Sequence, residues 1–301
     1  MNQHSALLTG ASGFIGAHLY QALLADDQWV VHTQPRASRN DDVLLADSVV
    51  FHLAGLAHAG ARSGARDTLF EVNVAQTCAL FAKALDAGAR RFVWLSSSKV
   101  LGEESSGPLK PDEPMRPEGL YAESKAAGEE ALQRYAALHN AEDRLCIIRP
   151  PLVYGPGVKA NFLSLVKWAL SGLPLPLAEA RALRSWVSVQ NLVELVLILA
   201  RHEDRGPDGT VWHVSDNADA SVADIIRLIA AAAESKPRLM TVSPRWLYGA
   251  ARIIGRDAAA RRLLGSLQLD VSSTVAALGW QPGLPVEQGI EKVVQWYLTQ
   301  R

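Results

Sequence analysis

Tyr121 and Lys125 stand four residues apart, a spacing that can carry proton-transfer chemistry. Because positions i and i+4 share one face of a helix, the phenol and the ammonium group can lie together. A nearby ammonium group favours the tyrosinate form and lowers the tyrosine pKa from its usual value of about 10. A tyrosine with such a pKa can accept and return a proton near neutral pH. The alternative interpretation is a solvated pair on a surface helix.

Three consecutive serines, Ser96, Ser97 and Ser98, follow the apolar run Phe92–Leu95. A hydroxyl group at the end of a strand can hydrogen-bond the same substrate oxygen that Tyr121 protonates. The alternative interpretation is a polar loop that binds nothing. We take the serines and Tyr121 as candidate parts of one catalytic site.

Three glycines lie between an apolar pair of leucines and the helical pattern of residues 17–25. A glycine turn between a strand and a helix brings backbone N–H groups and a helix N-terminus against a phosphate. Gly10 permits a tight turn, Gly13 lets a pyrophosphate approach the backbone, and Gly16 lets the helix pack closely on the strand. The alternative is a turn without a ligand.

These candidate residues need a scaffold, and apolar runs in the first half of the chain predict one. The predicted strands are Ala6–Thr9, Trp29–Thr33, Val49–Leu53, Arg91–Leu95 and Leu145–Arg149, with helices at Thr77–Ala87 and Ser124–His139. Alternating strands and helices indicate an α/β fold with a parallel sheet covered on both faces. Ligands lie at the carboxyl ends of such strands. Gly13, Ala54, Ser96 and Pro150 each follow a strand end, so they can line one crevice.

The connection between the second and third predicted strands is short. Only about 15 residues separate Thr33 from Val49, whereas a full strand–helix–strand unit needs about 30 or more. We therefore predict that one peripheral strand or helix is shortened or missing between residues 34 and 48.

The second half of the chain has a different character, with five prolines between residues 150 and 176. Short predicted strands alternate there with helices, which indicates a smaller C-terminal α+β lobe. We predict a dinucleotide-binding domain at residues 1–155 and a substrate lobe at residues 156–301, with some elements returning to the first domain. The predicted elements are strands Ser185–Val189 and Val211–Val214 and helices Asn191–Arg201, Val222–Ala233 and Val286–Leu298.

The composition excludes several classes of function. A formal net charge of −1 argues against binding to nucleic acid or to an anionic membrane surface. Cys78 and Cys146 form no C-x-x-C motif, which favours a reducing, cytoplasmic location. The run Leu192–Ala200 is too short to span a bilayer, and the first residues do not resemble a signal peptide. His52 and His58 lack partners at metal-ligand spacing, so no metal is expected.

Taken in chain order, these segments resemble the extended short-chain dehydrogenase/reductase family, which includes the NAD-dependent epimerases and dehydratases. The segments are the glycine turn, His52–Gly55, Asn73-Val74, Ser96-Ser97, Tyr121–Lys125 and Arg149–Gly157. The resemblance runs from Leu7 to about Trp296. It implies a Rossmann-type, doubly wound parallel sheet with the smaller lobe binding a nucleotide sugar.

The resemblance also implies roles for the candidate catalytic residues. Tyr121 matches the acid/base, and Lys125 matches the residue that binds the nicotinamide ribose and tunes the tyrosine. Ser97 matches the catalytic hydroxyl, because it stands five residues before Gly102, with Ser98 as the alternative. Leu101 replaces the tyrosine that usually precedes this glycine.

The resemblance implies a nicotinamide cofactor, and the residues after the second predicted strand favour NADP(H) over NAD(H) without deciding between them. No acidic residue follows the second predicted strand to bind a ribose 2′-hydroxyl, whereas Arg36 can pair with a 2′-phosphate. The predicted cofactor-binding residues are Gly10, Gly13, Phe14, Ile15, Gly16, Arg36, Leu53, Ala54, Gly55, Tyr121, Lys125 and Pro150.

The implied substrate is a UDP-sugar. The resemblance assigns Asn161 and Arg184 to the diphosphate, Leu175 to the uracil pocket and Arg262, or its neighbour Arg261, to a second phosphate contact. Ser98 and Lys99 complete the predicted substrate site. They stand where dehydratases of the family carry an Asp-Glu pair, so dehydration is not expected.

From this resemblance we predict reduction of the C4 ketone of a UDP-4-keto-6-deoxy-N-acetylhexosamine by NAD(P)H, in the synthesis of a bacterial surface polysaccharide such as O-antigen. One alternative is a UDP-hexose or UDP-N-acetylhexosamine 4-epimerase, which uses the same residues. Another is a non-catalytic NADP-binding sensor of the same fold. The resemblance further implies a homodimer that pairs helices Phe70–Ala87 and Ser124–His139.

Overall fold

The computed structural model describes residues 3–34, 46–57, 64–202, 209–253, 255 and 257–300. Its centre is a sheet of six strands in the order β10-β6-β4-β3-β1-β2, and every neighbouring pair is parallel. The predicted α/β class is confirmed. The strands are β1 (His4–Thr9), β2 (Trp29–Gln34), β3 (Val49–His52), β4 (Arg91–Leu95), β6 (Leu145–Arg149) and β10 (Val211–His213).

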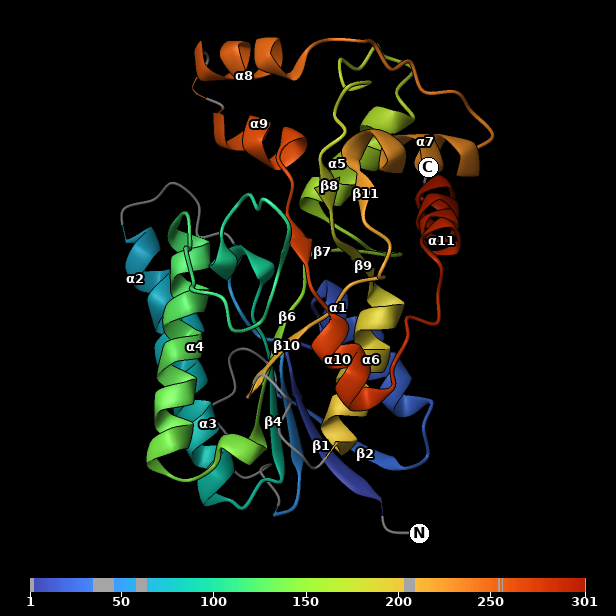
Figure 1. The fold of residues 1–301 in the computed structure, drawn as a ribbon. Helices are drawn as coiled ribbons and strands as arrows, with labels where there is room; N and C mark the ends of the chain where they lie inside the picture. The colour runs from blue at the N-terminus through green and yellow to red at the C-terminus, as the bar shows by residue number, and fades with distance from the viewer. Residues whose placement is uncertain are drawn as a thin grey trace.

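Helices cover both faces of this sheet (Figure 1). On one face, α1 (Phe14–Leu24) packs against α6 (Val189–Arg201), and on the other α3 (Thr77–Asp86) packs against α4 (Leu120–Leu138). Successive side chains of a strand point to opposite faces. Leu8 and Phe51 therefore join the core beneath α1 and α6, while Leu7 and Val50 join the core beneath α3 and α4. Both faces are apolar because both are buried.

Two predictions about the sheet need comment. The strand at Val211–Val214 was expected in the C-terminal lobe, but as β10 it pairs with β6 at the edge of the main sheet. The predicted division allowed for elements that return to the first domain, and β10 is one of them, because a strand's neighbours are set by the whole topology rather than by its position along the chain. At the other edge, β1 is the only described partner of β2. Residues 35–45 of the predicted short connection lie outside the described part of the chain.

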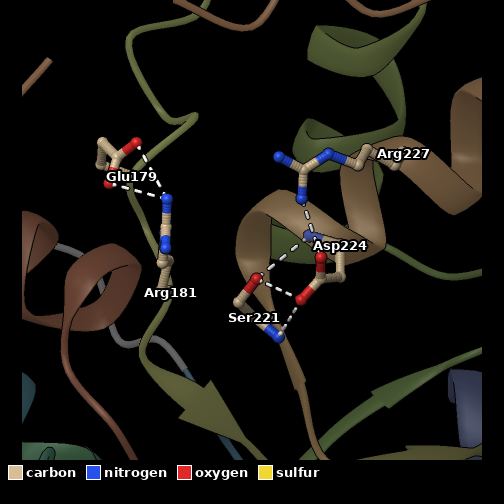
Figure 2. A network of polar contacts seen from close by, with 5 residues as sticks. All are labelled: Glu179, Arg181, Ser221, Asp224 and Arg227. Atoms are coloured by element: carbon tan, nitrogen blue, oxygen red, sulfur yellow. Dashed lines mark hydrogen bonds and ion pairs between the residues drawn. The ribbon is translucent and has the colours of Figure 1, made fainter. Parts of the chain in front are cut away.

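A further core lies in the C-terminal half, where α5, α7 and α11 pack together. Helix α7 begins at a capping box, in which Ser221 Oγ accepts a hydrogen bond from Asp224 N and Asp224 Oδ2 accepts one from Ser221 N (Figure 2). The helices of this half are α5 (Ala160–Ala169), α7 (Val222–Ala232), α8 (Pro244–Ile253), α9 (Asp257–Leu264), α10 (Ser272–Leu278) and α11 (Val286–Thr299). The division into two lobes and its boundary at residue 155 stay predictions.

The remaining elements are short. They are α2 (Ala65–Phe70), η1 (Glu71–Gln76), η2 (Ser98–Leu101), β5 (Pro108–Leu109), η3 (Glu142–Arg144), β7 (Leu152–Tyr154), β8 (Leu183–Arg184), β9 (Trp186–Ser188), β11 (Ala220–Ser221) and β12 (Gln268–Leu269). At the junction, Tyr154 of β7 donates a hydrogen bond of 2.6 Å to Asp216, and Asn191 of α6 donates one of 2.7 Å to the same carboxylate. This buried network ties β7 to α6.

None of the helices in the described ranges is long and apolar enough to cross a membrane. The same ranges contain no group of three or more His, Cys, Asp or Glu side chains that could hold a metal ion.

Candidate active site

The glycine turn after β1 packs against the loop after β3. A Cβ at Gly10 would lie 2.6 Å from Ala54 N and 2.8 Å from the carbonyl carbon of Leu53. A Cβ at Gly16 would lie 2.0 Å from Gly10 O, so only glycine fits there. Gly13 is the N-cap of α1. The structure therefore brings together these five predicted cofactor residues as a cradle of bare backbone at a helix N-terminus, which suits a pyrophosphate.

A buried histidine supports the residues of this cradle through hydrogen bonds. His52, at the end of β3, lies with Nδ1 2.7 Å from Thr9 Oγ1 and Nε2 3.0 Å from Thr77 Oγ1. Thr77 donates its own proton to Val72 O, and Thr9 Oγ1 accepts from Ala54 N. These bonds fit a neutral imidazole that donates from Nε2 and accepts at Nδ1. Burial, together with the charge of a nearby lysine, lowers the pKa of His52 to about 3.

Lys125 lies buried where β4 ends. Its Nζ donates a hydrogen bond of 2.8 Å to Leu95 O and lies 4.3 Å from the centre of the Trp94 ring. A Cβ at Gly55 would lie 3.4 Å from Nζ, so Gly55 and Lys125 are neighbours as predicted. Burial lowers the pKa of Lys125 to about 7, against the opposing effect of the Glu129 carboxylate one helical turn later.

Tyr121, in the first turn of α4, lies near the Ser97 hydroxyl group. Burial raises the pKa of Tyr121 above its usual value, and the Ser97 hydroxyl group opposes that rise. The expectation that Lys125 lowers this pKa is wrong for this arrangement. The shared helix face was predicted correctly, but the ammonium group is directed at Leu95 O and the Trp94 ring.

The serine triplet separates into different environments. Ser97 is the N-cap of η2, where its Oγ accepts a bond of 3.3 Å from Lys99 N, and it remains partly accessible beside Tyr121. Ser98 is 2% exposed, and its N–H donates to Pro150 O. Of the two serines considered for the catalytic hydroxyl, Ser97 is the one near Tyr121.

Asn73 is a further residue of this site, and sequence reasoning gave it no role. It lies fully buried in η1, a π-helix. Its Oδ1 accepts from Leu56 N, and its Nδ2 donates to Leu56 O and to Ser124 Oγ. Asn73 thus fastens the loop that carries Gly55 to helix α4. The motif Asn73-Val74 was noticed, but helical periodicity does not reveal a π-turn, which often marks a functional site.

Three predicted substrate residues lie in one neighbourhood. Arg184 is partly buried and donates a hydrogen bond of 2.6 Å to Gly265 O. Burial lowers its pKa, while Glu103 opposes this and Arg262 adds to it. Lys99 forms a salt bridge of 2.7 Å with Glu103. The side chains of Lys99, Arg184 and Arg262 therefore share a charged region with acidic groups.

The structure gives less support to the remaining predicted substrate residues. Leu175 N donates to Arg238 O, and Leu175 O accepts from Met240 N, so both backbone groups are already used within the protein. The contact of this segment with uracil stays a prediction. Asn161 is exposed near the start of α5. Arg36 lies outside the described residues.

Comparison with known proteins decides the family. The model of the NAD dependent epimerase/dehydratase family matches residues 6–215. The chain belongs to this family. A UDP-glucose 4-epimerase of Vibrio cholerae is 36% identical over 318 residues, covering 98% of this chain and 95% of that protein.

Two solved structures are similar to this family member in fold. The UDP-glucuronic acid 4-epimerase of Bacillus cereus in complex with NAD has a TM-score of 0.79 at 20% identity, covering 98% of this chain and 99% of that one. The protein RMD of Pseudomonas aeruginosa complexed with NADPH has a TM-score of 0.78 at 21% identity, covering 99% of both chains. Both nicotinamide cofactors therefore occur on this fold, and the expected preference for NADP(H) gains no support.

Acid is expected to destabilise this epimerase/dehydratase family member through His52. Between the folded pKa of about 3 and the ordinary histidine pKa of 6.5, the unfolded chain binds more protons, so the free energy of unfolding falls as pH falls. From pH 7 to pH 5 the loss is about 2 kcal/mol for this residue. Urea unfolding at both pH values measures it.

The control is His52→Gln, which lowers stability at pH 7 but removes the titration. Its loss between pH 7 and pH 5 should be smaller than that of the wild type by about 2 kcal/mol. His213, whose pKa is also lowered to about 3 by burial, contributes equally to both proteins. Equal losses in the two proteins would contradict a neutral His52.

Proposed function

We propose that this chain is a UDP-hexose 4-epimerase that inverts the C4 carbon of the sugar. The observation that carries the proposal is the grouping of Ser97, at the start of η2, with Tyr121 and buried Lys125 of α4, in a chain 36% identical to a UDP-glucose 4-epimerase over 98% of its length. The cradle of Gly10, Gly13 and Gly16 fits a dinucleotide pyrophosphate, because side chains there would collide with the backbone.

In the proposed reaction Tyr121 must be ionised to accept the proton of the C4 hydroxyl group, and it later returns that proton. Ser97 holds the same oxygen by a hydrogen bond. Lys125 places its terminal amino group, charged or neutral, beside the predicted site of the nicotinamide ribose. NAD, when bound, would accept a hydride from C4 and give it back. Between the two hydride transfers the sugar must turn its other face toward the cofactor. Tyr121 serves as base in the first transfer and as acid in the second.

A second candidate is reduction of the C4 ketone of a UDP-4-keto-6-deoxy-N-acetylhexosamine. One observation favours it. Burial raises the pKa of Tyr121 and so favours the neutral phenol, which is the form that donates a proton to a nascent alkoxide. Ser98 and Lys99 replace the acidic pair that dehydration would need. A role in surface-polysaccharide synthesis and a homodimer through α3 and α4 belong to this proposal as well.

One experiment separates the two candidates. The purified protein is incubated with UDP-glucose or with UDP-N-acetylglucosamine, with and without added NAD, and the sugars are resolved by NMR. Epimerisation without net change in absorbance at about 340 nm is the expected result. Stoichiometric oxidation of NADH or NADPH, seen only with a UDP-4-keto-6-deoxy sugar, would overturn the epimerase proposal and support the reductase. No turnover in any mixture would leave the sensor interpretation.

A further inference from the structure

Helix α8 (Pro244–Ile253) has an apolar face that no described part of the protein covers. Trp246 is 78% exposed and Ile253 is 87% exposed, the two highest values among the exposed large apolar side chains of the described residues. Ala250, also exposed, lies between them. Positions 246, 250 and 253 follow the i, i+4, i+7 spacing, so the three side chains form one stripe along the helix. We call this stripe the α8 face.

The opposite side of α8 is anchored in the protein. Leu247, Tyr248 and Ala251 are partly buried and pack against the core of the C-terminal half. Tyr248 also donates a hydrogen bond of 3.1 Å to Glu104. The helix therefore cannot turn its apolar stripe inward without losing these contacts. In Figure 1, α8 is the outermost helix at the end of the molecule opposite the N-terminus.

The α8 segment itself carries only positive charge, although Glu104 and Asp257 lie beside Arg252 on its anchored side. Residues 235–256 include five lysines and arginines and no aspartate or glutamate. Arg245 and Arg252 are exposed on the helix beside Trp246 and Ile253, and Lys236 and Arg238 are exposed in the preceding segment. The formal net charge of the whole chain is −1, so this segment is more basic than the chain as a whole. The nearest acidic residues in sequence lie just outside its two ends.

We propose that the α8 face docks on an anionic membrane surface. A helix with tryptophan and aliphatic side chains on one face and arginines beside them is the pattern of helices that lie in the lipid headgroup region. Trp246 and Ile253 would enter the boundary of the acyl chains, while Arg245 and Arg252 would pair with lipid phosphates. The earlier exclusion of an anionic membrane surface rested on net charge, which does not report a local patch. The proposal does not depend on the epimerase activity.

Vesicle co-sedimentation of the full chain tests this docking. Vesicles of phosphatidylcholine with about one third phosphatidylserine should bind the protein at low salt, and pure phosphatidylcholine vesicles should bind it far less. The double variants Trp246→Ser/Ile253→Ser and Arg245→Gln/Arg252→Gln should each weaken binding by about tenfold or more. Sugar turnover and circular dichroism confirm that the variants are folded.

Matched controls come from other surfaces of the chain. Leu24→Ser replaces an apolar residue of α1 that is 54% exposed, and Arg144→Gln removes an exposed charge from η3. Both controls should bind vesicles as the wild type does. Absence of binding to anionic vesicles, or equal binding by the α8 variants and the controls, would overturn the proposal. Concentration-dependent self-association that only the α8 variants lose, without vesicle binding, would instead identify a protein interface and also overturn it.

Discussion

Replacing Tyr121 with phenylalanine is expected to lower kcat by about 10²- to 10⁴-fold, the usual contribution of a positioned acid/base. The variant lacks only the hydroxyl group that lies near Ser97. The KM for the UDP-sugar should change much less than kcat, because the proton moves only in the chemical step. Initial rates of epimer formation, measured by NMR over a range of substrate concentrations, give both constants.

Tyr135→Phe supplies the matched control on the same helix. The Tyr135 ring stacks on His139 with the ring centres 4.2 Å apart, far along α4 from Tyr121. This variant should keep the wild-type kcat. If Tyr121→Phe retained more than about a tenth of kcat while Tyr135→Phe behaved as the wild type, Tyr121 could not be the acid/base.

Arg149→Met is expected to destabilise the fold by about 3–5 kcal/mol, because it leaves a buried carboxylate without its partner. Arg149 and Glu129 are joined at 2.6 Å, with 4% and 0% of their side chains exposed. Arg149 also donates a hydrogen bond of 2.8 Å to Pro111 O. Urea unfolding at pH 7 measures the loss. The double variant Arg149→Met/Glu129→Leu should recover much of it, since apolar pairs often replace buried ion pairs at little cost.

The ion pair of Arg227 with Asp224 provides the comparison (Figure 2). These side chains are 50% and 51% exposed at a separation of 2.8 Å. Arg227→Met should cost no more than about 1 kcal/mol, the range of exposed pairs. A loss for Arg149→Met no larger than for Arg227→Met would show that the buried pair is not an important support of the sheet.

The main sheet could be predicted from sequence because its strands carry a strong local signal. β4 and β6 have the predicted bounds and are apolar apart from Arg91 and Arg149, and the glycine turn marks where β1 ends. The place of β10 in the sheet could not be predicted, because its three residues, Val211–His213, resemble any short buried strand. Only the route of the chain after β9 shows that it returns to pair with β6.

The residues at the centre of the candidate site could be predicted from sequence, but the contacts around them could be predicted less well. Tyr121 and Lys125 share a helix face as their spacing requires, but spacing does not reveal that Lys125 Nζ bonds to Leu95 O. Glu129 offered a missed signal, since it stands four residues after Lys125 on the same face. Asn73 acts through a π-turn that no periodicity test detects.

The position of β10 has a consequence for the synthesis of the chain on the ribosome. β6 is complete at residue 149, yet its outer partner is not made until residues 211–213. For the intervening stretch the growing chain carries a buried-type apolar strand with one row of N–H and C=O groups open. Such an edge pairs readily with other nascent chains. Truncation before residue 211 should therefore yield aggregates rather than a free-standing nucleotide-binding half.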